Sequence, residues 1–207
     1  MFIPVDPKWL KTVLRCGAAA AILIALLLSA CDALPDLGGG PWPTATPETV
    51  SQWAASATAS SSYARPDWSP NRATGAPDVP GCSDDARAWA SSRGNGVEWL
   101  QLTFSQPVYA QEVRIHQTFG RGALSRVTVY DADGNGLVLW EGTDQPDPCP
   151  GVLIVRVPAQ VANPVTPTAP DGLPTTPFRV STVRIDLDES RTGFWNQIDA
   201  VELVGAP

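Results

Sequence analysis

Aromatic side chains next to arginine or asparagine are the residues of this sequence best suited to chemistry. The chain of 207 residues contains eight tryptophans, and several lie in segments rich in Gly, Pro, Ser and Asn, which favour loops. Aromatic rings can stack on the apolar face of a sugar, and Arg or Asn can hydrogen-bond its hydroxyl groups. The alternative is core packing, because tryptophan has a large apolar surface to bury. The candidate binding clusters are Arg65 with Trp68, Phe119 with Arg121, and Arg191 with Trp195 and Asn196.

Catalytic chemistry finds little support in the sequence. No Gly-x-Ser-x-Gly, His-Glu-x-x-His or Gly-rich phosphate-binding motif occurs. The single histidine, His116, is expected on the outward face of a strand. Asp84 and Asp85 are adjacent in a predicted loop, and adjacency alone does not place two carboxylates about 5 to 9 Å apart across a sugar. We therefore expect a binding protein and no enzyme.

The charge balance argues against a nucleic-acid partner. Acidic residues outnumber Lys and Arg by 21 to 14, and both lysines, Lys8 and Lys11, lie near the N-terminus. The arginines that follow are spread singly along the chain, with no basic cluster that could hold phosphates.

Residues 131–136, Asp-Ala-Asp-Gly-Asn-Gly, reproduce the first half of an EF-hand calcium loop. The second half fails, because position 12 is Gly142 where a bidentate glutamate belongs. The flanking residues alternate as strands do. Gly and Asn tolerate positive φ, so this segment is predicted to be a hairpin turn.

Residues 1–30 have the order of a secretory signal peptide: three basic residues, an apolar run from 16 to 28, and small residues. The tetrapeptide Leu28-Ser29-Ala30-Cys31 resembles the lipobox of bacterial lipoproteins. That resemblance implies cleavage before Cys31, a lipid on its sulfur, and a location outside the cytoplasm on a bacterial membrane. An ordinary cleaved signal and a retained span are the alternatives, although a span needs roughly 20 apolar residues.

Residues 31–49 are rich in Gly, Pro and Thr and are predicted to be a tether. Its proline-rich half favours an extended chain, which could lift a domain on the order of 50 Å from a bilayer.

Two cysteines remain after the signal peptide and the lipidated residue are set aside. Cys82 and Cys149 are expected to form a disulfide, because paired thiols in an oxidising compartment are usually bridged. A zinc site is the alternative, but neither cysteine has a neighbouring Cys or His at ligand spacing.

The rest of the chain, residues 50–207, has the alternation of β-strands. Apolar residues alternate with polar ones around 98–104, 113–116, 126–129, 153–157, 183–187 and 201–203. Trp89 and Trp99 are expected in the core between such strands. One connection, 159–177, is unusually long, and its Pro and Thr content favours a mobile loop. We therefore predict an all-β, antiparallel sandwich or barrel.

An ordered set of short motifs carries a family resemblance over about residues 50–205. The motifs are Trp68-Ser69-Pro70-Asn71-Arg72-Ala73-Thr74-Gly75-Ala76-Pro77-Asp78, Ala88-Trp89-Ala90, Glu98-Trp99-Leu100-Gln101-Leu102, Pro107-Val108-Tyr109, Val113-Arg114-Ile115, and Asn196-Gln197-Ile198-Asp199-Ala200-Val201-Glu202-Leu203. Together they resemble the galactose-binding-like, or discoidin-like, β-sandwich, in the variety found in pappalysins and bacterial surface proteins. The resemblance implies a jelly roll of about eight strands with binding loops at one end, and recognition of a glycan, lipid or protein.

Two departures from the family pattern and one metal site follow from the resemblance. Gly120-Arg121-Gly122-Ala123 stands where the family usually has Asn-Pro-Gly-Ala, and 159–177 is an insertion. Many discoidin-like sandwiches hold one structural Ca²⁺, which suits carboxylates and carbonyl oxygens. The alternative is that Asp78 and Asp85 cap turns and that Asp199 pairs with an arginine. The corresponding ligands would be Ala73, through its carbonyl, with Asp78, Asp85 and Asp199.

Two functions remain open from the sequence. The first is a glycan-binding module for cell-wall or extracellular polysaccharide, and the second is a protein-interaction or structural module of an envelope complex. Loop aromatics that stay exposed would favour the first, and a broad apolar patch on a sheet face would favour the second.

Overall fold

Alternating apolar and polar residues form eight strands in the computed structural model, which describes residues 48–161 and 171–207. The confirmed fold class is all-β with antiparallel pairing. In chain order the elements are β1 (Val50–Trp53), β2 (Ser56–Ala59), the 3₁₀ helix η2 (Pro70–Ala73), β3 (Val97–Phe119), β4 (Leu124–Tyr130), β5 (Gly136–Glu141), β6 (Gly151–Arg156), β7 (Arg179–Asp188), the 3₁₀ helix η3 (Glu189–Arg191) and β8 (Gln197–Ala206).

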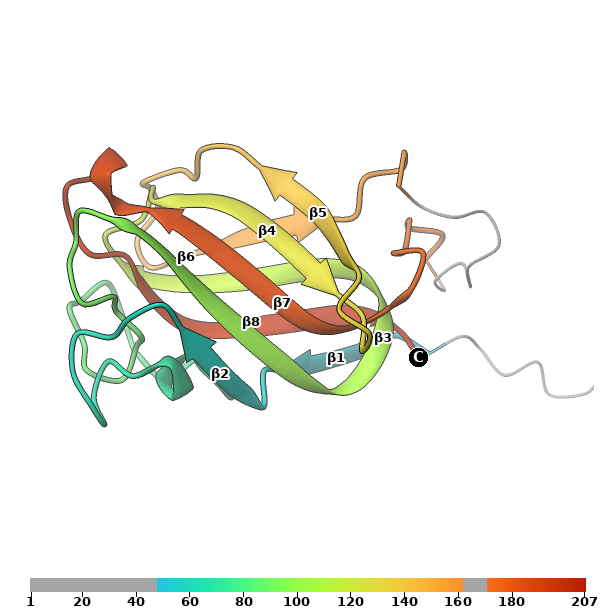
Figure 1. Cartoon of the computed structure of the whole chain (residues 1–207), viewed down its shortest axis with the longest axis horizontal. Coiled ribbons are helices and arrows are strands. Elements are labelled where there is room, and N and C mark those ends of the chain that lie inside the picture. The colour runs from blue at the N-terminus through green and yellow to red at the C-terminus, as the bar shows by residue number, and fades with distance from the viewer. Residues whose placement is uncertain (1–47, 162–170) are drawn as a thin grey trace, which may run out of the picture. The chain divides into compact units, whose positions relative to one another are not determined.

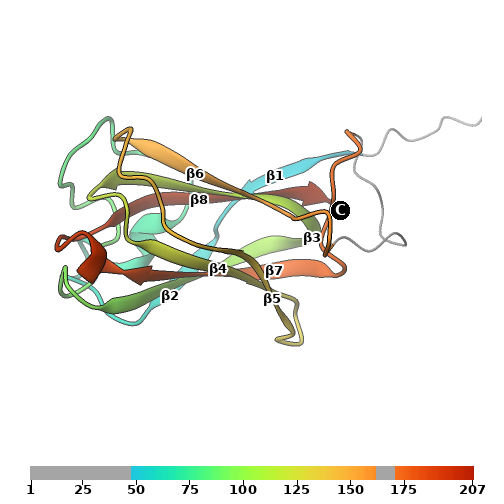
Figure 2. The same cartoon turned by 90° about the horizontal axis from the view of Figure 1, so that it is seen from above.

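The long strand β3 belongs to both layers of the sandwich (Figures 1 and 2). Its first part pairs with β2 and β7, and its second part pairs with β8 and β6. The register shifts between Thr103 and Val108, a segment that contains Pro107, which has no N–H to donate to a ladder. The sheet therefore folds over on itself, with β2, β7, β4 and β5 in one layer and β1, β8 and β6 in the other.

The apolar sides of the two layers face each other and form the core. Leu100 and Leu102 of β3 are fully buried, as are Ile185 and Leu187 of β7. Their outward neighbours are polar or half-exposed, which is the alternation that the sequence showed.

The tryptophans divide between core and surface. Trp89 is fully buried, and its indole N–H donates to Ser61 O at 3.1 Å, so its predicted core position is confirmed. The core prediction is wrong for Trp99, which is only half-buried under the guanidinium of Arg184, 4.8 Å from the ring centre. Trp53 lies in β1, not in a loop, and packs edge-on against the half-buried His116.

Two predicted connections are confirmed. Cys82 and Cys149 form a disulfide, which ties the segment after η2 to the segment before β6. Residues 131–136 form the hairpin turn between β4 and β5, where the Asp131 carboxylate accepts from the N–H groups of Asp133 and Asn135.

The described end of the long connection at 159–177 packs against the sandwich. Residues 162–170 lie outside the described part, but the following residues are fixed to the sandwich. Thr176 is fully buried, and its hydroxyl accepts from Ala110 N–H at 2.9 Å. Asp171 accepts from the Gln111 amide at 2.8 Å.

The N-terminal predictions fall outside the described residues. The signal peptide, Cys31 and most of the tether at 31–49 are among residues 1–47. In the part that is described, no helix has the length and apolar character needed to cross a membrane.

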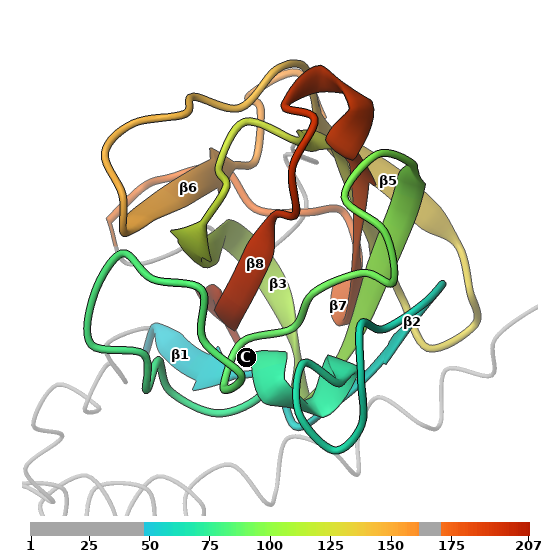
Figure 3. The same cartoon turned by 90° about the vertical axis from the view of Figure 1, so that its left-hand side faces the viewer.

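Connecting loops gather at one end of the sandwich (Figure 3). They are the β2–β3 connection at 60–96, the turn at 120–123 after β3, and the segment at 189–196 before β8. The first and third of these segments, together with Phe119 at the end of β3 and Gln197 at the start of β8, supply the walls of the site described next.

Candidate functional site

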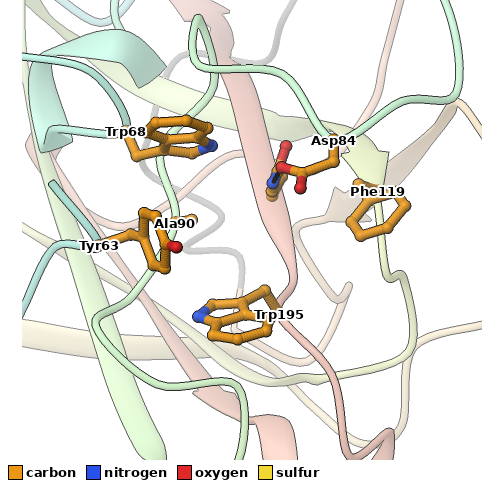
Figure 4. A pocket seen from close by; sticks show the side chains of 7 residues that line it. Tyr63, Trp68, Asp84, Ala90, Phe119 and Trp195 are labelled. Atoms are coloured by element: carbon orange, nitrogen blue, oxygen red, sulfur yellow. Dashed lines mark hydrogen bonds between the residues drawn. The ribbon is translucent and has the colours of Figure 1, made fainter.

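A pocket of about 150 Å³ opens among the loops at this end (Figure 4). Its walls are mostly aromatic, with two polar side chains among them. We call this the aromatic pocket, and its residues are Tyr63, Trp68, Asp84, Ala90, Phe119, Trp195 and Gln197.

The ring of Tyr63 stands nearly perpendicular to two tryptophan rings along one side of the pocket. Tyr63 contacts Trp68 with ring centres 5.2 Å apart and Trp195 with ring centres 5.7 Å apart. The planes meet at 71° and 87°, the edge-to-face geometry that aromatic quadrupoles favour. Tyr63 keeps 55% of its surface exposed, so these rings hold each other in place while still facing solvent.

The backbone at Trp68 adopts a conformation that an aromatic residue rarely takes. Its φ is 50°, in the left-handed region where Cβ crowds the following carbonyl. Two backbone hydrogen bonds fix it: its N–H donates to Ala86 O at 3.0 Å, and its O accepts from Ala90 N–H at 3.3 Å. Strain of this kind concentrates at functional sites. Glycine would adopt this φ without strain, so the indole ring is present here at a conformational cost.

Glycines on both sides let the chain at Trp195 approach closely. A Cβ on Gly94 would lie 2.6 Å from Trp195 N, and one on Gly120 would lie 1.8 Å from Trp195 O. Gly120 also has a φ of 57°, which favours glycine. The departure from the family pattern at residue 120 therefore has a local reason, since only glycine leaves room for the chain that carries the indole ring.

Polar atoms that face the pocket are only partly used by the protein. Gln197 is buried, donates to Asp84 Oδ1 and accepts from Asp85 N–H at 3.0 Å. No described residue donates to the second carboxylate oxygen of Asp84, which projects toward the pocket (Figure 4). The buried indole N–H of Trp195 also has no acceptor among the described residues, and it points toward the ring of Tyr63. A ligand in the pocket therefore finds one free acceptor, because the indole N–H is covered by protein atoms.

Behind the aromatic pocket lies a buried group of polar side chains, Gln117, Arg121, Asp144 and Asn196, which we call the polar cluster. Asp144 accepts from Gln117 Nε2 at 2.8 Å and from Arg121 Nη2 at 3.3 Å. Asn196 donates to Gln117 Oε1 at 2.7 Å and to Gly120 O at 3.2 Å. The cluster joins the turn after β3 to the segment before β8 and so supports the loops above it.

Glu189 is a second buried support for the loops. Its carboxylate accepts from Ser91 Oγ at 2.7 Å and from Asn196 N–H at 3.1 Å. Burial raises the pKa of Glu189 to about 7, although both hydrogen bonds act in the opposite direction. The bond to Asn196 fixes the backbone directly after Trp195.

Sequence comparison assigns the chain to a family. Residues 44–207 match the family described as Pappalysin-1, SD scarf domain, C-terminal. The chain belongs to this family. The resemblance inferred from the motifs is thereby confirmed, and we refer to the described sandwich as the scarf domain. A comparison with curated proteins finds no match.

Solved structures similar to the scarf domain are carbohydrate-binding modules. A selenomethionine-labelled variant of chitosan-binding module 1, from a chitosanase/glucanase of Paenibacillus sp. IK-5, has a TM-score of 0.50 at 15% identity, covering 72% of this chain and 93% of that one. A pectin-binding module scores 0.49 at 15% identity, with coverage of 72% and 89%. The family 32 module of C. perfringens NanJ, in complex with galactose, scores 0.49 at 13% identity, with coverage of 75% and 99%. The likeness shows the galactose-binding-like fold.

Three of the seven residues predicted to bind a ligand meet in the aromatic pocket: Trp68, Phe119 and Trp195. Two others are structural. Arg121 and Asn196 are buried in the polar cluster, where they pair with protein groups.

The remaining two predicted residues lie elsewhere on the scarf domain. Arg65 borders a separate shallow hollow beside β2 and η2. Arg191 donates to Gly142 O at 2.8 Å and pairs with Asp188 at 3.3 Å. Sequence proximity to a tryptophan therefore did not indicate a shared site, because neighbouring residues in these loops point in different directions.

The predicted calcium ligands do not fit a metal ion. Arg87 binds both carboxylate oxygens of Asp85 and donates to Asp78 O at 2.9 Å. This pairing lowers the pKa of Asp85 to about 2. Asp199 accepts from the backbone N–H groups of Asp78 and Val79, each at 3.3 Å.

The guanidinium of Arg87 thus supplies the positive charge among these aspartates. The fourth predicted ligand, Ala73, is a buried residue of η2. Within residues 48–161 and 171–207, no group of three or more His, Cys, Asp or Glu side chains is arranged to hold a metal. In the structure it is Asp85, and not Asp199, that pairs with an arginine, while Asp199 accepts from backbone N–H groups.

Sequence reasoning missed four residues of the pocket: Tyr63, Asp84, Ala90 and Gln197. Tyr63 could have been found, since it lies five positions before Trp68 in the same loop. Asp84 and Gln197 are 113 residues apart, and nothing local indicates that they bond.

Proposed function

We propose that the scarf domain is a glycan-binding module and that the aromatic pocket receives the sugar. The observation that carries the proposal is Trp68. Its ring is held beside a solvent-facing pocket by a backbone conformation that costs about 1 to 2 kcal/mol for a residue with a Cβ. A ring placed in the core needs no such arrangement.

The chemistry of the walls suits a sugar. The pocket rings can cover the apolar C–H face of a pyranose, as they would cover any apolar surface. The free oxygen of Asp84 can accept a hydrogen bond from a sugar hydroxyl. Protein–sugar hydrogen bonds of this kind replace bonds to water and so contribute mainly to specificity.

The size of the pocket indicates what part of a glycan would enter. A volume of about 150 Å³ is well below the roughly 300 to 1,000 Å³ of sites for drug-sized ligands. Most of the residues that line the pocket belong to the loops that gather at one end of the sandwich. We therefore infer that it takes one terminal sugar unit and leaves the rest of the chain in solvent.

The similar Paenibacillus structure supports the proposal, because that protein is a chitosan-binding module of the same fold. The competing protein-interaction function would require buried loop aromatics and a broad apolar patch. Instead Tyr63 and Phe194 at the loop end are 55% and 48% exposed. Binding through the loop end is thus the better explanation of the structure, and we propose no catalytic role.

A glycan array tests this function with the full-length chain. We expect the wild type to bind at least one class of glycan and the Trp195→Ala variant to lose that binding. Tyr109→Ala serves as the control, because Tyr109 pairs with Ala206 at the far end of β8 from Gln197, roughly 30 Å away at 3.3 Å per residue. If no glycan is bound, or if both variants bind as the wild type does, the proposal fails.

We also propose that a lipid on Cys31 anchors the protein to a bacterial membrane outside the cytoplasm. The support is the sequence Leu28-Ser29-Ala30-Cys31 after an apolar run. Cys31→Ala is expected to release the protein from the membrane fraction or to leave the signal peptide uncleaved. A variant that fractionates and migrates as the wild type does would refute the anchor without affecting the glycan proposal.

A further inference from the structure

The aromatic pocket contains one acidic side chain and no basic one. Of the seven residues that line it, only Asp84 is acidic, and none is Arg, Lys or His. The imbalance is specific enough to indicate a charge on the ligand. We propose, on the basis of the glycan-binding function above, that the pocket selects a cationic amino sugar, with the protonated amine of a de-N-acetylated unit placed between Asp84 and the aromatic rings.

Two arginines close to the loop end have partners in the protein. Arg121 pairs with Asp144, with only 4% of its side chain exposed, and Arg87 is held by Asp85. Arg65 and Arg93 of the β2–β3 connection are exposed but do not line the pocket. A uronic acid would therefore bring its carboxylate toward Asp84 in a pocket whose own lining has no cation to offset the repulsion. The same arrangement attracts an ammonium group.

The aromatic rings add a second attraction for a cation. Tyr63, Trp68 and Trp195 present ring faces and edges around a small volume, with Asp84 across from Tyr63 (Figure 4). Aromatic faces attract ammonium groups electrostatically, and most strongly where water is displaced. Proteins recognise organic cations with this combination, in which several aromatic rings and one carboxylate surround the cation.

Asp84 is held in position before any ligand arrives. Gln197 is 2% exposed, and its amide donates to one oxygen of Asp84 while its carbonyl oxygen accepts from Asp85 N–H. This contact orients the carboxylate and leaves its other oxygen free of protein donors in the described part of the chain. Because the acceptor is preorganised, little conformational entropy is lost when an ammonium group binds.

The test compares two oligosaccharides that differ only in their N-acetyl groups. Isothermal titration calorimetry of the full-length chain with β-1,4-linked glucosamine and N-acetylglucosamine tetrasaccharides, in mildly acidic low-salt buffer, measures both affinities. We expect the glucosamine oligomer to bind about tenfold more tightly or better, and the preference to shrink at high salt. Asp84→Asn keeps the acceptor for Gln197 and removes the charge, so both oligomers should then bind alike.

The matched control is Asp133→Asn, which makes the same change at an exposed position in the turn between β4 and β5. It should keep the preference. Equal binding of both oligomers by the wild type, or an unchanged preference in Asp84→Asn, would overturn the amino-sugar inference.

Glycan recognition itself would still stand in that case if Trp195→Ala abolished the binding of both oligomers. If neither oligomer bound but another glycan did so through Trp195, the inference alone would fail. If no glycan bound at all, both proposals would fail.

Discussion

The aromatic pocket and the polar cluster behind it differ in residue type and in how far their side chains are buried. In the pocket, Tyr63 is 55% exposed, and the N–H of Trp195 has no acceptor in the described residues. In the cluster, Asp144 is buried and accepts from Gln117, Arg121 and two backbone N–H groups. The residues that can serve a ligand are those that border the pocket, because the cluster residues are buried even where an atom such as Arg121 Nε has no partner among the described residues.

The two groups of residues are expected to contribute to different properties of the protein, the cluster to stability and the pocket to ligand binding. Breaking the cluster leaves a buried charge without its partner, which costs far more than trimming a ring that faces water. The pocket residues should therefore matter for binding and little for folding, and the cluster residues the reverse.

The largest effect is expected at Arg121. Arg121→Met removes the guanidinium but keeps most of the volume, which leaves Asp144 buried with one fewer partner. We expect a loss of about 3 to 5 kcal/mol in the free energy of unfolding, measured by urea denaturation.

The control for Arg121 is an exposed ion pair of the same scarf domain. Arg126 and Glu141 are 46% and 64% exposed, so Arg126→Met should cost less than about 1 kcal/mol. Similar losses in the two variants would show that the cluster is not the support that its burial indicates.

A medium effect, dependent on pH, is expected at Glu189. Because burial raises its pKa from 4.5 to about 7, the folded state holds the proton more tightly than the unfolded state does. Its contribution to stability is fullest below pH 4.5 and declines as the pH rises through about 7.

Glu189→Gln removes this titration and keeps an acceptor for Asn196 N–H and a polar partner for Ser91. The quantity to follow is the unfolding free energy of the variant minus that of the wild type. This difference should increase by on the order of 1 to 3 kcal/mol as the pH is raised from acidic to neutral. Parallel urea titrations at several pH values measure the difference. A constant difference across that range would contradict the assigned role of burial.

The smallest effect distinguishes the ring of Trp68 from its backbone. Trp68→Ala and Trp68→Gly both remove the indole ring, but only glycine relieves the positive φ of 50°. We expect the glycine variant to be more stable than the alanine variant by about 1 kcal/mol, with ligand binding lost in both. Equal stabilities by thermal denaturation would mean that the left-handed backbone is not strained.

Much of the fold could be predicted because its signals are local. The alternation at 98–104 and 183–187 predicts which faces of the strands are buried. The glycines and asparagine at 134–136 predict a hairpin turn. The continuity of β3 was not predictable, since the bend between Thr103 and Val108 depends on how two layers pack. The four-residue strands β1 and β2 are too short to show a period.

The candidate site could be predicted only in part, because the sequence does not show which of the candidate side chains are buried. Trp68 and Trp195 were candidates on residue type, and their exposure among the loops agrees with that interpretation. Arg121 was an equally suitable candidate for ligand binding on residue type. In the structure its side chain is buried and pairs with Asp144, 23 residues further along the chain. The role of Asp84 depends on Gln197 in a distant strand, which no sequence pattern indicates.

The central claim is that the rings of the pocket bind a glycan and do not hold the fold together. The most direct test measures glycan affinity and the urea midpoint on the same three variants, Tyr63→Ala, Trp68→Ala and Trp195→Ala, using the glycan that binds best on the array. The account predicts that each variant loses about tenfold or more in affinity while most of the unfolding free energy remains. Variants that bind as the wild type does, or that lose the 3 to 5 kcal/mol typical of a truncated core aromatic, would contradict it.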